Sequence, residues 1–257
     1  MKKTALITGA SSGIGKELAR IHAEKGGDLI VVARSEDKLL DLKKELESQY
    51  KISVTVIPKD LSKTSAAQEI YDEVKALGLK VDYLMNNAGF GGQGYFHERD
   101  WDKDLSMMNV NMFALTNLTR LFLPEFVKRN SGKILNTSST AGEMPGPLQA
   151  VYYATKAYVT SFSNALSIEL EDTNITVTAL LPGATNTGFA STSGMDKTDL
   201  FRNMGTPDKV ARDGYEAMLT GKMNVISGIS PIMMNLMGMM PKKTLLRTIK
   251  KQQEVRG

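Results

Sequence analysis

The sequence predicts an α/β protein whose single domain is a doubly wound parallel sheet with helices on both faces. Two observations favour this fold. Short apolar runs alternate with longer amphipathic stretches, and a glycine-rich turn follows the first run. Runs that are apolar on both faces are typical of parallel strands covered by helices, and their alternation with helices is typical of doubly wound folds. The length of 257 residues agrees, because it suffices to bury one large core.

Six apolar runs are expected to be strands, with helices between them. The first helix is expected over residues 16–25, and a long one over about 104–128. Leu39, Leu42 and Leu46 have the spacing of one buried helix face. A methionine-rich and then basic segment begins near residue 226, so we expect a catalytic domain over 1–225. Residues 226–257 would be an extension packed on it or on a partner subunit. The predicted strands cover 4–8, 29–33, 54–57, 83–85, 133–135 and 177–181.

Composition excludes several classes of protein. The chain has no cysteine, which excludes disulfides, thiolate metal sites and cysteine nucleophiles and suits the cytoplasm. His22 and His97 join no cluster with metal-ligand spacing, so no metal is expected. No secretory signal or membrane-spanning segment is expected either. The net charge is +4, but residues 241–257 contribute +5 and the remainder −1, so no nucleic-acid partner is expected.

The turn after the first predicted strand has the properties of a dinucleotide-binding turn. Its glycines follow the pattern G-x-x-x-G-x-G, and a helix begins directly after them. Glycine permits a tight turn and a close approach to a pyrophosphate, whose charge a helix N-terminus stabilises. A turn that merely links strand to helix is the alternative. The expected cofactor-binding residues of this turn are Gly9, Ser11, Ser12, Gly13, Ile14 and Gly15.

The end of the second predicted strand favours NADP over NAD. Sites that prefer NAD carry an acidic residue there, which binds the ribose hydroxyls. Here Ala33 and Arg34 hold that place, and the acids Glu36 and Asp37 come later. A guanidinium can bind a 2′-phosphate with charge assistance. The alternative for Arg34 is a solvated side chain at a helix start.

The stretch AVYYATKAYV, residues 150–159, sets a phenol beside a cation. Tyr152 and Tyr153 precede Lys156 by four and three residues, so either ring can share its helix face. An ammonium about 4 Å away, at an effective dielectric of about 20, would bring the pKa of a phenol from about 10 toward 7. A phenol that titrates near neutral pH suits general acid–base catalysis.

Together these segments resemble the short-chain dehydrogenase/reductase family in its single-domain form. The resemblance covers residues 4–187, about three-quarters of the chain. In that family a serine precedes the catalytic tyrosine by thirteen residues and a lysine follows it by four, which selects Tyr152 with Ser139 and Lys156. Tyr153 and Tyr158 are then packing or pocket residues. The matching motifs are TGASSGIG at 8–15, DL at 60–61, NNAG at 86–89, VN at 110–111, SS at 138–139, YYATK at 152–156 and PGATNT at 182–187.

The resemblance implies the roles of further residues. Tyr152 would exchange a proton with the substrate oxygen, Ser139 would hydrogen-bond that oxygen, and Lys156 would also bind the nicotinamide ribose. Asn111 would hold a water that relays protons to Lys156. Ser139 as a local cap and Asn111 as a buried polar residue are the alternatives. The remaining implied cofactor contacts are Asp60, Leu61, Asn87, Ala88, Gly89, Pro182, Gly183, Thr185 and Thr187.

The sequence therefore predicts an NADP(H)-dependent oxidoreductase that transfers hydride between the nicotinamide and a carbonyl or secondary alcohol. A non-catalytic dinucleotide-binding sensor on the same fold is the alternative. Loops at 90–96, 143–149 and 188–205 would wall a moderately apolar substrate pocket, and the last would act as a lid. A homodimer or homotetramer is expected from the resemblance. The basic tail would pack on the protein itself or make a weak membrane-surface contact.

Overall fold

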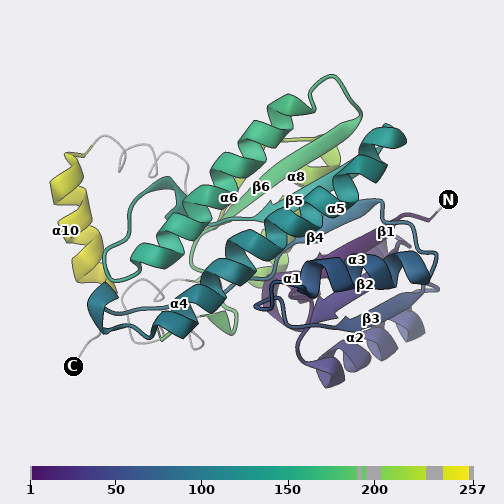
Figure 1. Ribbon diagram of the computed structural model, residues 1–257, viewed down its shortest axis with the longest axis horizontal. Coiled ribbons are helices and arrows are strands. Elements are labelled where there is room, and N and C mark those ends of the chain that lie inside the picture. The colour runs from purple at the N-terminus through teal and green to yellow at the C-terminus, as the bar shows by residue number, and fades with distance from the viewer. Residues whose placement is uncertain (1, 190–192, 195–203, 230–239, 255–257) are drawn as a thin grey trace.

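The described residues form one parallel seven-stranded sheet in a computed structural model. The model describes residues 2–189, 193–194, 204–229 and 240–254. The strand order is β3-β2-β1-β4-β5-β6-β7, and every neighbouring pair is parallel (Figure 1). The predicted doubly wound α/β fold is confirmed. The strands are β1 (Thr4–Thr8), β2 (Asp28–Ala33), β3 (Val54–Pro58), β4 (Tyr83–Asn86), β5 (Gly132–Thr137), β6 (Ile175–Pro182) and β7 (Asn224–Ser227).

Helices cover both faces of the sheet and pack on alternate residues of its strands. Ala5 and Ile7 of β1 face one apolar cluster, whereas Leu6 lies in the other, as the period of two requires. The first cluster holds α1 (Gly13–Glu24), α2 (Glu36–Gln49) and α8 (Pro207–Thr220) against the sheet. The second holds α3 (Ala66–Ala76), α5 (Leu115–Lys128) and the end of α6 (Ala150–Glu169).

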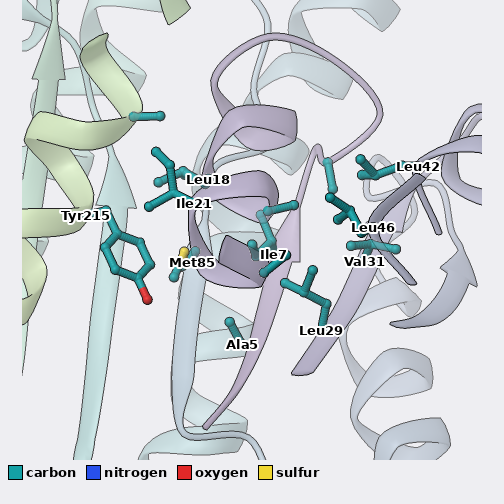
Figure 2. Packing of buried hydrophobic residues seen from close by; sticks show 14 of the residues in the cluster. Ala5, Ile7, Leu18, Ile21, Leu29, Val31, Leu42, Leu46, Met85 and Tyr215 are labelled. Carbon is teal, nitrogen blue, oxygen red and sulfur yellow. The ribbon is translucent and has the colours of Figure 1, made fainter. Parts of the chain in front are cut away.

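The first cluster shows why the α2 leucines have helical spacing. Leu42 and Leu46 point at Val31 and Leu29 of β2, while Leu18 and Ile21 of α1 lie near Ile7 and Met85 (Figure 2). Leu39 is buried with them. Tyr215 of α8 closes the cluster on the other side. This packing fixes the start of α1, and with it the glycine-rich turn, at the carboxyl end of β1.

Two elements depart from the expected boundaries. The seventh strand was not predicted, and it pairs with β6 from Ala179↔Asn224 to Pro182↔Ser227. The sheet therefore continues to Ser227, so the predicted domain boundary after residue 225 falls inside β7. The long helix predicted over about 104–128 is three consecutive pieces: α4 (Trp101–Met108), a π-helical stretch η2 (Asn109–Ala114) and α5.

The C-terminal helix α10 (Lys242–Gln253) lies beside the first turn of α6 and the segment that precedes α4 (Figure 1). Its buried residues are Leu245, Ile249 and Gln253, four apart along one face. Residues 230–239, which hold the methionine-rich part of the tail, lie outside the described residues. Within the described part of the chain, no helix has the length and apolar character to span a membrane.

Candidate active site

The glycine-rich turn between β1 and α1 is packed too closely for side chains. Gly9 and Gly13 have φ of +68° and +55°, in the left-handed region that glycine adopts without strain. A Cβ on Gly15 would lie 2.3 Å from the Gly9 carbonyl oxygen and 2.4 Å from Nδ2 of Asn87. These three glycines therefore form a bare backbone surface at a helix N-terminus, which fits a pyrophosphate.

The segments at 86–89 and 182–187 meet this turn. The amides of Asn87 and Ala88 both donate to the Thr8 hydroxyl at 3.0 Å. A Cβ on Gly13 would lie 2.9 Å from Cγ2 of Thr187. Segments separated by about 80 and 170 residues thus converge on one turn. Ser11, Ser12 and Ile14 lie in the turn itself, with Ser12 exposed.

Arg34 and Asp60 lie at neighbouring strand ends beyond β2 and β3. Arg34 is exposed and directly follows β2. Burial opposes ionisation of Asp60, but hydrogen bonding with Ser62 and the nearby charges of Arg34 and Lys63 outweigh it and lower the pKa of Asp60. The Ser62 amide donates to Oδ1 of Asp60 at 3.0 Å, and Leu61 is buried. This edge has the position expected for an adenosine pocket.

Tyr152 and Ser139 face each other at the carboxyl ends of β5 and β6. Ser139 follows β5 and lies close enough to the Tyr152 hydroxyl to oppose the effect of burial on the pKa of the phenol. Its Oγ also donates to the Pro182 carbonyl at 3.3 Å and accepts from the Ala141 amide at 3.1 Å. The Tyr152 ring lies 5.3 Å from that of Phe189, so the phenol has an apolar flank. Ser139 is therefore both a local cap and a partner of the phenol.

Lys156 does not lower the pKa of Tyr152 in the way the sequence suggested. Its Nζ donates to the Thr137 carbonyl at 2.8 Å and lies 5.9 Å from the centre of the Tyr152 ring. Burial raises the pKa of Tyr152 above its ordinary value, against the hydrogen bond with Ser139, and burial lowers the pKa of Lys156 to about 8. The expected pKa near 7 is wrong for the protein's own groups, because desolvation penalises both charged forms.

Asn111 lies within the π-helical stretch and next to Lys156. Its Nδ2 donates to the Phe90 carbonyl and to the Thr155 hydroxyl, both at 3.0 Å, while its Oδ1 accepts from the Phe90 amide. A Cβ on Gly89 would lie 3.1 Å from Oδ1 of Asn111 and 3.3 Å from Nζ of Lys156. Single π-turns occur often at functional sites. The NNAG loop, Asn111 and Lys156 thus form one cluster.

The segment after β6 holds the remaining expected cofactor contacts and meets Ser139 through the Pro182 carbonyl and Gly13 through Thr187. The Gly183 amide donates to Ser227 of β7 at 2.8 Å, and the buried Thr185 forms a bridge with Gly205. Ser193 contacts the loop after β4, where its Oγ accepts from the Gly91 amide at 3.2 Å. The rest of the expected lid, 190–192 and 195–203, lies outside the described residues.

Tyr153 differs from Tyr152 in its partner. Its hydroxyl accepts a hydrogen bond of 2.7 Å from Nε2 of Gln253, and burial raises the pKa of Tyr153 to about 12. The two rings lie edge to face, 6.0 Å apart. Gln253 was missed by sequence reasoning, since it lies 100 residues away in the tail and belongs to no motif. Among the described residues, no three His, Asp or Glu side chains are grouped as a metal site.

The model of the short chain dehydrogenase family matches residues 3–198. This chain belongs to that family. The very-long-chain 3-oxoacyl-CoA reductase of Rattus norvegicus is 36% identical over 184 residues. That alignment covers 69% of this chain but 58% of the rat protein, so the chain matches little more than half of this relative.

Two solved structures of the family extend the likeness over nearly the whole chain. A short-chain dehydrogenase from Sphingobium yanoikuyae, solved in complex with NADPH, is 29% identical with a TM-score of 0.83 and covers 98% of both chains. The bulky-bulky ketone specific alcohol dehydrogenase from Comamonas testosteroni is 27% identical with a TM-score of 0.80. The match covers 99% of this chain and 97% of the Comamonas testosteroni chain.

Proposed function

We propose that this short chain dehydrogenase is an NADP(H)-dependent oxidoreductase that interconverts a ketone and a secondary alcohol. One observation carries the proposal. The buried phenol of Tyr152 lies beside Ser139, Lys156 and Asn111, and that cluster adjoins the glycine-rich turn through the NNAG loop. A binding protein that only sensed a dinucleotide has no use for a buried phenol paired with a hydroxyl in this place.

The residues have separate tasks in ketone reduction. When bound, a reduced nicotinamide would supply the hydride that the carbonyl carbon receives. Tyr152 donates its phenolic proton to the carbonyl oxygen, and the raised pKa keeps that proton on the phenol until it is needed. Ser139 donates a hydrogen bond to the same oxygen as negative charge develops. The positive charge of Lys156 then favours the phenolate that remains. Asn111 lies next to Lys156, and its side chain holds the Phe90 backbone there by hydrogen bonds.

NADP is the proposed form of the cofactor. Arg34 is exposed at the end of β2 and forms no hydrogen bond or ion pair with other described residues. Its guanidinium is therefore available to a 2′-phosphate, with which it can form paired, charge-assisted bonds. The relative from Sphingobium yanoikuyae, solved with NADPH, supports this choice. An acidic residue that would select the free ribose hydroxyls of NAD is missing at this position.

A ketone with apolar groups on both sides is the proposed substrate class. The walls around Tyr152 include Phe90, Met144 and Phe189, which pack against the two tyrosines as one apolar cluster. The relative from Comamonas testosteroni is named for bulky-bulky ketones, and the rat relative is named for very-long-chain 3-oxoacyl-CoA. Both names support a roomy apolar site.

The proposal includes the association and location of the protein. Trp101 and Leu105 of α4, Phe113 of η2 and Tyr158 of α6 are exposed apolar side chains, which suits a homodimer or homotetramer. Because the apolar stripe of α10 is buried, any contact of this helix with an anionic membrane surface would be electrostatic. The cysteine-free composition supports the cytoplasm.

The test is a panel of ketones and secondary alcohols offered with NADPH and with NADH. We expect ketone-dependent oxidation of NADPH, with slower turnover of NADH. If NADPH binds but no ketone or alcohol on the panel is converted, the protein is the alternative, a dinucleotide-binding protein without catalysis.

A further inference from the structure

Gln253 is buried completely, although it lies on a helix whose other polar residues are mostly exposed. Leu245 and Ile249 precede it on the same face of α10 and are also buried. Its amide Nε2 donates to the Tyr153 hydroxyl at 2.7 Å. The helix therefore packs by a stripe of two apolar residues that ends in a glutamine bonded to the catalytic helix.

The end of α10 also rests on the loop that follows β4. The Gln93 side chain donates to the Gln253 backbone carbonyl, and the Lys250 ammonium lies 5.2 Å from the centre of the Tyr95 ring. Arg99 supports this loop from the other side, donating to the Gln93 carbonyl at 2.8 Å. Its guanidinium pairs with the buried carboxylate of Asp104 in α4. The loop is thus fixed between α4 and α10.

The same loop lines the catalytic phenol. A Cβ on Gly91 would lie 2.8 Å from Cζ of Phe189 and 3.4 Å from Cδ2 of Tyr152. The Gly94 amide donates to the Leu148 carbonyl at 2.9 Å. Leu148 has a φ of +68°, a strained value for a residue with a side chain. Strain of this kind is retained where surrounding structure over-determines it, often at ligand sites.

We propose that α10, held by the hydrogen bond between Gln253 and Tyr153, forms the outer wall of the substrate site, and that Gln253 is a specificity-determining residue that positions bulky ketones against Tyr152. The inference rests on the proposed function and names the part of this chain that selects among its substrates. Because Gln253 bonds Tyr153 rather than Tyr152, a wall built on α10 would touch the far end of a large ketone and leave a small ketone at Tyr152 untouched.

The chemistry of Gln253 supports a role beyond packing. Among the described residues its Oε1 is buried and has no hydrogen-bond partner. Burying an amide that is only half paired is unfavourable, so an apolar side chain would serve a purely structural helix better. A glutamine at this position fixes α10 to Tyr153 through Nε2 and leaves Oε1 enclosed, which is explained if the position of the helix matters to the neighbouring site.

The experiment is a double-mutant cycle on the pair. Gln253→Met keeps the length of the side chain but removes the hydrogen bond, and Tyr153→Phe removes its acceptor. With NADPH saturating, we expect each variant to raise the KM for benzophenone about threefold to tenfold, the size of one net hydrogen bond. The KM for butanone should change less than twofold. The double variant should resemble either single variant, because both remove the same interaction.

Gln252→Met and Tyr158→Phe are matched controls, since both side chains are exposed and lie on the same helices. They should leave the selectivity between the two ketones unchanged. Hydrogen exchange should be faster in α10 of both pair variants, without a change in the Kd of NADPH.

Two results would overturn the inference while the proposed function stands: additive effects in the double variant, or equal changes in KM for both ketones. A wild-type protein that converts no ketone at all would instead contradict the proposed function.

Discussion

The Nζ atom of Lys156 lies 5.9 Å from the centre of the Tyr152 ring and hydrogen-bonds the Thr137 carbonyl instead. Both side chains are buried. Burial raises the pKa of the Tyr152 phenol, which therefore stays protonated at neutral pH, and lowers the pKa of the Lys156 amine to about 8. The protein's own groups thus prepare Tyr152 as an acid. The same burial opposes conversion of the phenol into a base.

The two neighbouring tyrosines should respond differently to loss of the hydroxyl. Tyr152→Phe removes the proton donor and should lower kcat/KM by about 10²–10⁴-fold with every substrate, which is the usual contribution of general acid catalysis. NADPH binding should persist. Tyr153→Phe should keep most turnover of small ketones, because its hydroxyl bonds Gln253. Steady-state kinetics and NADPH fluorescence measure both effects, and activity in Tyr152→Phe with loss in Tyr153→Phe would reverse the assignment.

The raised pKa of Tyr152 predicts different pH profiles for the two directions of reaction. Reduction needs the protonated phenol, which a raised pKa keeps populated, so kcat/KM for ketone reduction should be nearly flat from about pH 6 to 8. Alcohol oxidation needs the phenolate, so its kcat/KM should rise with pH over the same range. Initial rates in both directions, in buffers of constant ionic strength, test this. A reduction rate that falls steeply between pH 6 and 7 would contradict it.

The sequence predicted the fold well because each element follows a local pattern. The six expected strands are apolar on both faces, and the α2 leucines are buried as their spacing indicated. The seventh strand was not predicted because it has only four residues, NVIS, of which the first is exposed and the next two are half-buried. The π-helical stretch escaped because a π-turn differs from an α-helix by one hydrogen-bond register, which apolar spacing does not report.

The residues of the candidate site could be predicted where they belong to a sequence motif, but the properties that burial determines could not. Spacing placed Ser139, Tyr152 and Lys156 in one region, and the structure brings them together. Their pKa values depend on desolvation, which a sequence does not contain. Gln253 reaches Tyr153 only through the tertiary packing of α10, so no local pattern could reveal it.

Arg34 should determine the choice between the two cofactors. Arg34→Ala should raise the KM for NADPH about tenfold to hundredfold, the value of a charge-assisted hydrogen bond, while the KM for NADH changes little. Lys38→Ala is the control, because Lys38 is an exposed cation one turn into α2. Equal losses with both cofactors would show that Arg34 does not bind the 2′-phosphate.

Gly15 should tolerate no side chain. In Gly15→Ala the new methyl would lie 2.3 Å from the Gly9 carbonyl oxygen, so the turn must shift, and overpacking of this kind costs about 1–3 kcal/mol. We expect the Kd of NADPH to rise about tenfold, measured by nicotinamide fluorescence. Gly188→Ala is the control, because no atom of the described residues lies within 4 Å of its Cβ position. Unchanged binding in Gly15→Ala would mean that the turn does not hold the cofactor.

His22 should make the protein less stable in mild acid. Its Nδ1 lies 2.8 Å from the Tyr215 hydroxyl and its Nε2 lies 2.9 Å from the Lys3 carbonyl. Burial lowers the pKa of His22 below its ordinary value, against the backbone hydrogen bonds and the nearby charges of Asp28 and Asp82. The unfolded chain therefore binds the proton first as the pH falls. The stabilisation is fully present above about pH 6.5 and is lost progressively below it.

His22→Gln should separate this effect from general acid sensitivity. We expect a lower Tm than wild type at pH 7.5, because a buried hydrogen-bonding pair is disturbed, and a smaller further decrease between pH 7 and 5. His97→Gln is the control, since His97 is exposed and its loss should leave the wild-type pH dependence intact. Thermal unfolding followed by circular dichroism at several pH values measures both. If the Tm of His22→Gln falls as much between pH 7 and 5 as that of wild type, carboxylates elsewhere govern the acid response. A smaller decrease in the variant requires that the native state keeps His22 neutral.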